Sequence, residues 1–190
     1  MGQPKQLLPL HGRPLLQHVV DAAAASCLDE IIVVLGHRAE EIRAALICPQ
    51  HLQVVVNSEW AAGQSTSLRA GLRAASADAV AVAVLLGDQP FVNATVIDAV
   101  GAAFLGANPC MARPVYTTGD GSRVPGHPVF LARRVWSDVE TLRGDQGARA
   151  LLSPHPEWLL EVPMEGDAPA DIDTWEDYRY TIAAAAPSTK

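Results

Sequence analysis

The feature that most constrains the fold is an uninterrupted apolar run at residues 79–86, which leads into "GDQP". A strand with one wet face alternates apolar and polar residues, but this run is apolar at every position. Such a run predicts a strand that is covered on both faces, as in α/β proteins whose helices lie on both sides of a sheet. We therefore expect an α/β fold with this strand near its centre.

Helical and extended patterns alternate through the first part of the chain, which predicts βαβ units and a mostly parallel sheet. Expected strands there are 30–36 and 53–57, and expected helices are 15–23, 39–46, 63–75 and 93–105, with Asn93 as an N-cap. The later part predicts a long hairpin from 111–116 and 126–132, a strand at 157–164, and helices at 133–142, 145–153 and 173–186. With no internal repeat or linker, residues 1–190 are expected to form a single domain.

The composition narrows the range of functions. The formal net charge of the 190 residues is -7, which argues against a protein that coats nucleic acid. Three widely spaced cysteines without a C-x-x-C pair argue against a zinc site or a disulfide framework and fit a reducing cytoplasm. No apolar run approaches the ~20 residues of a membrane span, and no signal peptide precedes the first element. We expect a cytoplasmic protein without nucleic-acid or membrane partners.

Three carboxylates follow predicted strands, and ligands of α/β sheets bind beyond the carboxyl ends of strands. Asp88 comes directly after the apolar run, although an Asp before Pro90 is also a common turn residue. Asp171 and Asp173 alternate along "DID" around Ile172, although Asp173 could simply cap the following helix. Together the three aspartates suit Mg²⁺ (magnesium), which commonly joins carboxylates to substrate phosphates.

Other polar stretches are weaker signals. "GQSTSLRAG" offers hydroxyls and N–H groups at a helix start, which can bind an anion or only cap the helix. Lys5 alone is read as a surface charge, and His127 before a proline as a loop residue.

The separate stretches fall into one ordered pattern. "MGQPKQLLPLHGRPLLQHV", "GQSTSLRAGL", "LLGDQPFV", "GHPVFL", "GDQGARALL" and "DIDTWEDY" together resemble the molybdenum cofactor cytidylyltransferase group of the MobA-like nucleotidyltransferases. The resemblance extends to about Tyr178. It implies a three-layer, Rossmann-like nucleotidyltransferase (GT-A-like) fold, with a nucleotide-binding half at 1–100, an acceptor-binding half at 101–180 and a tail at 187–190.

The resemblance also implies a reaction. The terminal phosphate of molybdopterin attacks the α-phosphate of a nucleoside triphosphate, CTP in this group, and Mg²⁺-bound pyrophosphate leaves. The attacking phosphate is already an anion, so no strong general base is required. A molybdoenzyme or its chaperone is a further possible partner.

The resemblance assigns roles to residues by matching motifs. Lys5 and Asp88 match the catalytic positions. Asp88 also matches a metal ligand of the group, and Asp171, Asp173 or both match the second one. The positions that match nucleotide contacts are Gly2, Pro4, Lys5, Asn57, Gln64, Ser65, Ser67 and Gly87. The positions that match acceptor contacts are His127, Gly144, Asp145 and Arg149. Trp175 stands where the group usually has Pro, at the start of a helix.

The front of the sequence departs from the pattern. The group has a buried strand and a turn, L-A-A-G-x-x-x-R, ahead of the M-G-x-P-K found here. We expect "MGQPKQLLPL" to be the second half of that turn, with the first strand apparently missing. A chain that truly starts at Met1 would lose backbone partners worth about 1–3 kcal/mol each and is expected to be marginal in stability and activity.

Two classes of function remain open. The first is a nucleotidyltransferase, either for molybdopterin or for another acceptor such as a sugar phosphate. The second is a non-catalytic or truncated homologue that binds a cofactor or a partner protein.

Overall fold

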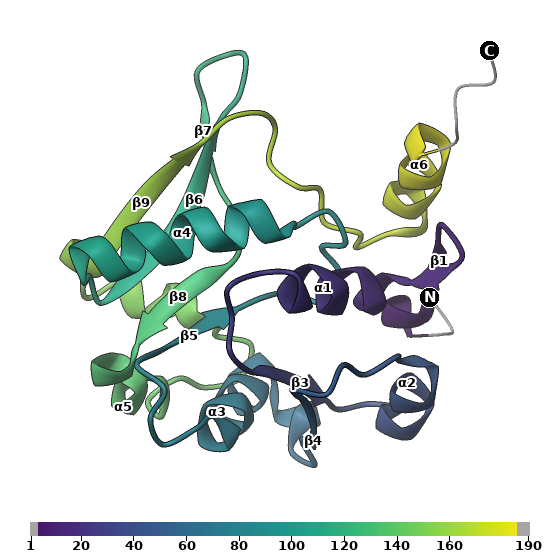
Figure 1. Ribbon diagram of the computed structural model, residues 1–190, viewed down its shortest axis with the longest axis horizontal. Coiled ribbons are helices and arrows are strands. Elements are labelled where there is room, and N and C mark those ends of the chain that lie inside the picture. The colour runs from purple at the N-terminus through teal and green to yellow at the C-terminus, as the bar shows by residue number, and fades with distance from the viewer. Residues whose placement is uncertain (1–3, 186–190) are drawn as a thin grey trace.

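Helices and strands alternate along most of the chain in this computed structural model, which describes residues 4–185 (Figure 1). The strands are β1 Pro9–Leu10, β2 Arg13–Pro14, β3 Ile31–Leu35, β4 Leu52–Val56, β5 Ala81–Val84, β6 Met111–Thr117, β7 Arg123–Pro125, β8 Val129–Ala132 and β9 Leu159–Met164. The α-helices are α1 Leu15–Ala24, α2 Ala39–Ala45, α3 Gln64–Ala74, α4 Ala94–Ala107, α5 Trp136–Val139 and α6 Trp175–Ala185. Short 3₁₀ turns lie at Lys5–Leu7, Trp60–Ala62, Arg133–Val135, Ala148–Leu152 and Pro156–Trp158.

The larger sheet is mixed rather than mostly parallel. Its order is β5-β8-β6-β7, and β9 also pairs with β6. β8 runs antiparallel to both β5 and β6, whereas β9 runs parallel to β6. The chain turns back after β6 through short connections, and short connections join antiparallel strands. The α/β class and the antiparallel pairing predicted from 111–116 and 126–132 are therefore confirmed, but the larger sheet as a whole is mixed.

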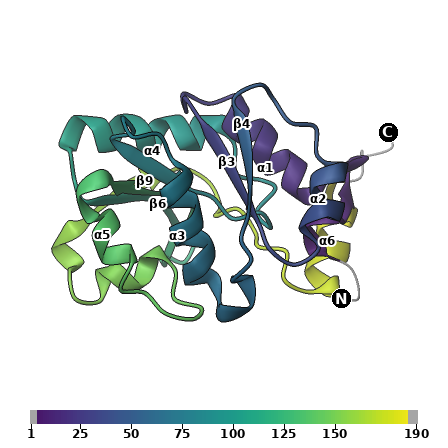
Figure 2. The same cartoon turned by 90° about the horizontal axis from the view of Figure 1, so that it is seen from below.

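β3 and β4 form a separate parallel pair, as their alternation with helices predicted. Ile31 pairs with Leu52 at one end and Leu35 with Val56 at the other. Figure 2 shows this pair standing between α3 and α1, and both helices contact β3.

Helices cover both faces of the larger sheet, which gives three layers. Ile97 and Phe104 of α4 pack in one apolar cluster with Phe130 of β8. Leu72 of α3 and Val139 of α5 pack in a second cluster, which includes the opposite face of the same strands. In Figure 1, α4 crosses in front of the sheet.

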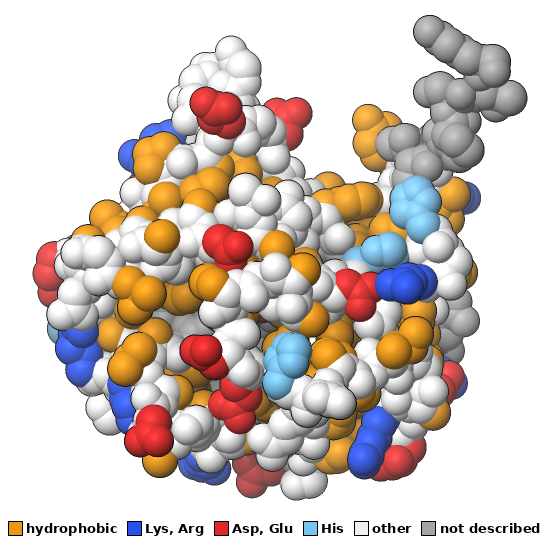
Figure 3. Space-filling model, in the orientation of Figure 1, with side chains coloured by type: hydrophobic (Ala, Val, Ile, Leu, Met, Phe, Trp, Pro, Cys, Tyr) orange, Lys and Arg blue, Asp and Glu red, His pale blue; other side chains and the backbone are white. Residues whose placement is uncertain are grey.

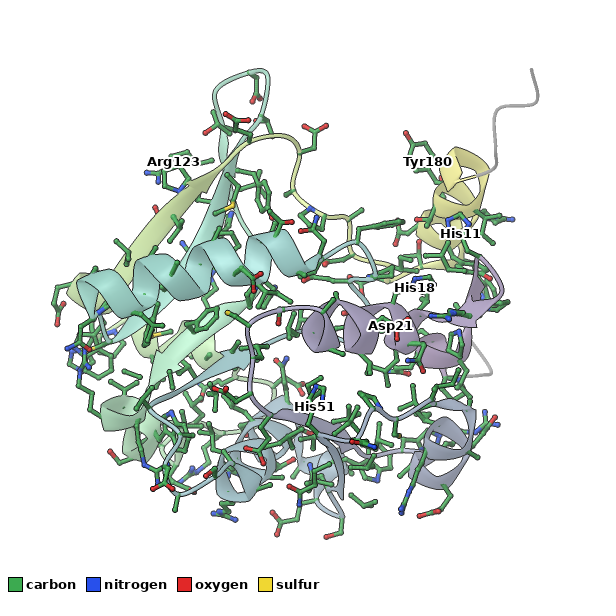
Figure 4. The ribbon with its side chains drawn as sticks, viewed as in Figure 1. His11, His18, Asp21, His51, Arg123 and Tyr180 are labelled. Carbon is green, nitrogen blue, oxygen red and sulfur yellow. The ribbon has the colours of Figure 1, made fainter. Side chains whose placement is uncertain are left out.

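The last helix packs against the first hairpin. The hydroxyl of Tyr178 in α6 donates to the carbonyl of Pro9 at 2.6 Å, and Leu8 and Ile172 are buried in the same cluster. His11, in the turn between β1 and β2, marks this junction beside the α6 ribbon in Figure 4. The two ends of the described chain are thereby joined.

Several local expectations need correction. β5 is half-buried along its whole length, not covered on every side, because only β8 pairs with it among the described strands. Residues 133–142 form a 3₁₀ turn and the short α5, and residues 148–152 form a 3₁₀ turn instead of an α-helix. These segments are too short for helix propagation to offset the cost of the first turn.

None of the helices described within residues 4–185 has the length and apolar character required to cross a bilayer. On the face seen in Figure 3, the Lys and Arg side chains lie in small separate groups among apolar and neutral atoms.

We predict that Asn93→Ala lowers the free energy of unfolding by about 1 kcal/mol. The Asn93 side chain accepts from the backbone N–H of Val96 at 3.0 Å, which confirms the predicted cap of α4. Urea unfolding measures the loss. Thr95→Ala, an exposed substitution in the same turn, is the control and should stay within about 0.5 kcal/mol; equal losses in both variants would contradict a specific capping effect.

Candidate active site

A lysine between two carboxylates forms the charged centre of the molecule. The Nζ atom of Lys5 lies 2.5 Å from Oδ2 of Asp88 and 2.8 Å from Oδ1 of Asp173. Lys5 belongs to the turn before β1, Asp88 follows β5, and Asp173 precedes α6. Three segments far apart in sequence therefore meet at one ammonium group.

The "DID" segment is anchored by its central residue. Ile172 is completely buried, and its N–H donates to the carbonyl of Asp88 at 3.2 Å. The N–H of Thr174 donates to Asp177, and the Thr174 hydroxyl accepts from the N–H of Asp177, as in a capping box. Thr174 therefore caps α6, and the carboxylate of Asp173 is left to contact Lys5.

The environment of Lys5 keeps it charged. Burial by itself lowers the pKa of Lys5, but hydrogen bonds to Asp173 and Asp88 and their negative charges outweigh burial and raise it. Lys5 is therefore an ammonium group at neutral pH, and the two carboxylates with this one cation retain a net negative charge.

Asp171 is turned to a different partner. Its carboxylate accepts from the side-chain amide of Gln89, a residue only 5% exposed. Within residues 4–185 no three acidic, His or Cys side chains gather as a metal cluster, so the three aspartates are not assembled as ligands here. Asp88 and Asp173 each place one carboxylate oxygen within 3 Å of the same nitrogen atom, Nζ of Lys5.

Asn57 organises the loop before α3. Its amide nitrogen donates to the hydroxyls of Thr66 at 2.8 Å and Ser67 at 3.0 Å, and its oxygen accepts from the N–H of Glu59. Asn57 is only 6% exposed. It therefore positions the loop and has little surface left for a ligand.

The loop before α3 packs directly against residues 144–147. The N–H of Ser65 donates to the carbonyl of Gly144 at 3.0 Å, and the N–H of Gln64 points to Asp145 at 3.4 Å. Ser65 is fully buried, and its hydroxyl has no partner among the described atoms. Two residues predicted to contact the acceptor, Gly144 and Asp145, thus lie against residues predicted to contact the nucleotide.

One cleft of about 930 Å³ joins these regions. Its rim includes Pro4, Gln6 and Gly87, which neighbour Lys5 and Asp88 in sequence. The rim also includes Gln64, Ser67 and Gly147, from α3 and the segment that packs against it. Its floor is formed by β3 and β5. A Cβ atom on Gly87 would lie 3.1 Å from Leu16, so only glycine allows this approach without a shift.

His127 lies in the field of the charged centre rather than beside Gly144. Burial lowers its pKa from 6.5, with a smaller lowering by Arg113, while the negative charges of Asp171 and Asp88 act in the opposite direction. His127 is therefore a neutral imidazole at neutral pH. The peptide bond between His127 and Pro128 is cis.

The remaining predicted residues are dispersed. Arg149 is exposed on the 3₁₀ turn Ala148–Leu152, and Gly2 lies outside the described residues. The four predicted acceptor contacts are thus divided between two places.

Sequence reasoning also missed a group of charged residues on β6, β7 and β9, and Gln89 beside Asp88. Arg113 donates to Glu161 at 2.6 Å, and Arg123 donates to its other oxygen at 2.7 Å. The hydrogen bond from Arg113 lowers the pKa of Glu161. Figure 4 places Arg123 beside the end of β9, far from α1. Gln89 stands inside "GDQP" and could have been noticed, but nothing in the sequence joins Glu161 to residues so far upstream.

We predict that Gly63→Ala disrupts the contact between the loop before α3 and residues 144–147. Gly63 has a φ of +105°, and an added Cβ would lie 2.2 Å from the carbonyl carbon of Gly144. Urea unfolding should show a loss of about 2 kcal/mol or more. Gly106→Ala is the control: it is a helical glycine with open space around it, and alanine there should add about 0.5–1 kcal/mol.

We predict that His127→Gln reduces the loss of stability on mild acidification. Because folding lowers the His127 pKa, the unfolded chain takes up a proton below pH 6.5 that the folded chain does not. Stability is therefore full above that pH and falls as the pH drops toward the folded pKa. Unfolding measured at about pH 7.5 and about pH 5.5 should show the larger difference in the unchanged protein. His51→Gln, at an exposed position labelled in Figure 4, should behave like the unchanged protein.

Sequence comparison identifies relatives over most of the chain. Residues 1–158 match the family described as MobA-like NTP transferase domain. The chain is 31% identical over 179 residues to nicotine blue oxidoreductase of Paenarthrobacter nicotinovorans, which covers 91% of this chain and 85% of that protein. It is 37% identical over 94 residues to the bifunctional protein GlmU of Burkholderia thailandensis, covering 50% of this chain but only 20% of GlmU.

Solved structures agree with this relationship. Rv0371c of Mycobacterium tuberculosis is 31% identical with a TM-score of 0.81, over 96% of this chain and 90% of that one. A structure of Rv0371c in complex with manganese has 30% identity and a TM-score of 0.78, over 96% and 93% of the two chains. A homologue from Mycobacterium sp. strain JC1 has 30% identity and a TM-score of 0.83, over 97% and 89%. The chain belongs to the MobA-like NTP transferase family.

Proposed function

We propose that this protein transfers CMP from CTP to molybdopterin, with release of pyrophosphate and with Mg²⁺ as the cofactor. The observation that carries the proposal is the position of Lys5 between Asp88 and Asp173, where the described chain offers both a phosphate-binding cation and two carboxylates. The preference for CTP and molybdopterin comes from the six ordered motifs, in a family that transfers nucleotides from NTPs.

Asp88 and Asp173 fit a divalent cation. Their oxygens already converge on one positive charge, and carboxylate oxygens are the ligands that hard cations prefer. Manganese in the Rv0371c structure supports this assignment, and Asp171 is close enough in sequence to contribute if it leaves Gln89. A bound cation would neutralise charge on the triphosphate and on the leaving pyrophosphate.

Lys5 has two successive partners in this proposal. It neutralises the two aspartates when they hold no cation, and it contacts the triphosphate when they do. In the first role, its raised pKa keeps the ammonium charged. Pro4 and Gly87 would shape the backbone around the phosphates.

The rim of the cleft would hold the base and ribose. Gln64 and Ser67 line the cleft, whereas Asn57 and Ser65 act behind them as positioning residues. Gly144 and Asp145 were assigned to the acceptor, but in this arrangement they act by holding Gln64 and Ser65 in place.

The acceptor would then approach His127, which lies in the field of Asp88 and Asp171, and the exposed Arg149. A phosphate oxygen of molybdopterin forms the new bond to the α-phosphorus, and the bond from that phosphorus to pyrophosphate breaks. No proton has to be removed from an attacking phosphate anion, so a neutral His127 serves by orientation. Lys5 contributes charge stabilisation as negative charge builds on the leaving group.

Two competing functions remain. The motif resemblance keeps a sugar-phosphate acceptor open, and the relative nicotine blue oxidoreductase is named for an oxidoreduction. A third possibility is a chain that binds CTP or molybdopterin without turnover. Two parallel assays separate these functions. In the first, the protein is incubated with Mg²⁺, each of the four NTPs and either molybdopterin or a sugar phosphate, and the release of pyrophosphate is measured. In the second, the protein is incubated with nicotine blue and NADH or NADPH, and the reduction of the dye is measured. Pyrophosphate from CTP and molybdopterin supports the proposal, and reduction of nicotine blue without pyrophosphate would overturn it.

We predict that Asp88→Asn lowers the rate of pyrophosphate release by on the order of 100-fold or more, because a shared cation ligand and a partner of Lys5 are lost. Asp167→Asn makes the same chemical change at an exposed position and should leave the rate unchanged. Full activity in Asp88→Asn would refute the metal assignment.

We predict that Mn²⁺ makes Lys5 more reactive. If the cation binds the carboxylate oxygens of Asp88 and Asp173, Lys5 loses the hydrogen bonds that raise its pKa. A larger fraction of Lys5 is then the neutral amine, which is the nucleophilic form. Acetylation of Lys5 at mildly alkaline pH, followed by peptide mass spectrometry, should speed up by about threefold or more. The effect should disappear in the double variant Asp88→Asn with Asp173→Asn; unchanged acetylation in the original chain would count against a shared cation.

A further inference from the structure

An exposed tryptophan stands beside the cleft and has no role in the site described above. Trp60 begins the 3₁₀ turn Trp60–Ala62, which leads into α3, and it is 45% exposed. A single exposed apolar side chain is normal on a protein surface and calls for no ligand by itself. Trp60 differs from such a residue because its backbone is fixed and because a glycine makes room for its side chain.

The backbone around Trp60 is held on both sides. The N–H of Glu59 donates to the side-chain oxygen of Asn57 at 2.9 Å, and the carbonyl of Glu59 accepts from the hydroxyl of Thr66 at 3.1 Å. The carbonyl of Trp60 accepts from the N–H of Gly63 at 3.1 Å. Trp60 is thereby tied to the residue that follows β4 and to the start of α3, so its indole extends from a rigid turn.

The segment after β3 receives the indole. A Cβ atom on Gly36 would lie 2.4 Å from Cβ of Trp60 and 2.8 Å from its Cγ, so any side chain at position 36 would displace Trp60. The imidazole of His37 lies beside the indole, with 5.0 Å between the ring centroids and 52° between the ring planes. This spacing is within the range of favourable aromatic pairs. We call Trp60 and His37 the aromatic shelf.

The aromatic shelf adjoins the residues that hold the base and ribose in the proposed function. Gln64 and Ser67 line the same cleft as His37. Gly63, whose N–H donates to the carbonyl of Trp60, directly precedes Gln64. A base in contact with the amide of Gln64 would therefore lie next to the indole.

The chemistry of the shelf suits a planar heterocycle. Aromatic side chains bind nucleobases by stacking on the face of the ring, whereas amides and hydroxyls bind the polar edge of the base. The indole of Trp60 offers a face, and Gln64 offers an amide for the edge. The two residues would thus bind different parts of one base.

We propose that the nucleobase of the bound NTP stacks on the indole of Trp60, and that His37 is a positioning residue that orients this indole. The inference rests on the proposed function, because it requires an NTP in the cleft. Every base has a face that can stack, so Trp60 contributes affinity rather than a choice among bases.

Calorimetric titration with CTP and Mg²⁺, without an acceptor, tests the contact. Trp60→Ala should raise the dissociation constant by about tenfold, and Trp60→Phe, which keeps a ring, by no more than about threefold. The factor for Trp60→Ala should be similar with GTP. Trp175→Ala is the matched control, because Trp175 is 44% exposed but belongs to α6, and it should leave both dissociation constants unchanged.

Inorganic tripolyphosphate with Mg²⁺ separates the shelf from the phosphate contacts, because it carries no base. Its dissociation constant should be the same in Trp60→Ala and in the unchanged protein. If the variant weakens CTP and tripolyphosphate equally, or weakens neither, stacking is refuted while the proposed function stands. If the unchanged protein binds neither compound, the proposed function and the stacking contact are both refuted.

A pterin tests whether the shelf serves the acceptor instead, since a pterin is also a planar heterocycle. The probe is 6-hydroxymethylpterin, titrated into the same variants. Unchanged pterin affinity in Trp60→Ala, together with weaker CTP binding, supports the assignment to the nucleobase. Weaker pterin binding with unchanged CTP binding would place the acceptor on the shelf and refute that assignment.

Tryptophan fluorescence gives a second readout of the same contact. A base stacked on Trp60 should quench part of the emission of the four tryptophans when CTP is added with Mg²⁺. The quenching should persist in Trp175→Ala and disappear in Trp60→Phe, which still binds CTP. Equal quenching in Trp60→Phe and in the unchanged protein would contradict stacking on Trp60.

Discussion

The site depends on one positive charge held between two negative ones. Asp88 and Asp173 lie far apart in the sequence, and without Lys5 their carboxylates would repel each other. Ile172 is completely buried, and its N–H donates to the carbonyl of Asp88. These two contacts hold Asp173 at a fixed position relative to Asp88. The contact of α6 with the first hairpin then fixes the segment that carries Asp173.

The cleft connects this centre to the interior of the sheet. The rim carries Pro4, Gln64, Ser67 and Gly87, while the floor is formed by the edges of β3 and β5. A ligand bound at the rim would therefore lie next to the edges of β3 and β5.

Local features were predictable because their causes are local. The β3–β4 pair, α3, α4 and the Asn93 cap follow from apolar periodicity and side-chain hydrogen bonding within a few residues. The pairing of β8 with β5 and the shortness of α5 were not predictable in this way, because they depend on which strand edge and which helix face was available. The half-buried state of β5 has the same origin, since its apolar sequence says nothing about whether a neighbour is present.

The sequence by itself determined the candidate residues, the α/β class and the family pattern, because these rest on residue types and their order. Only the tertiary structure decided how the residues are grouped. It brought Asp173 rather than Asp171 to Lys5, moved Gly144 and Asp145 beside Ser65, and placed His127 near the aspartates. The reason is that these groupings rest on hydrogen bonds and charges between segments far apart in the chain, and spacing along the sequence does not encode such contacts.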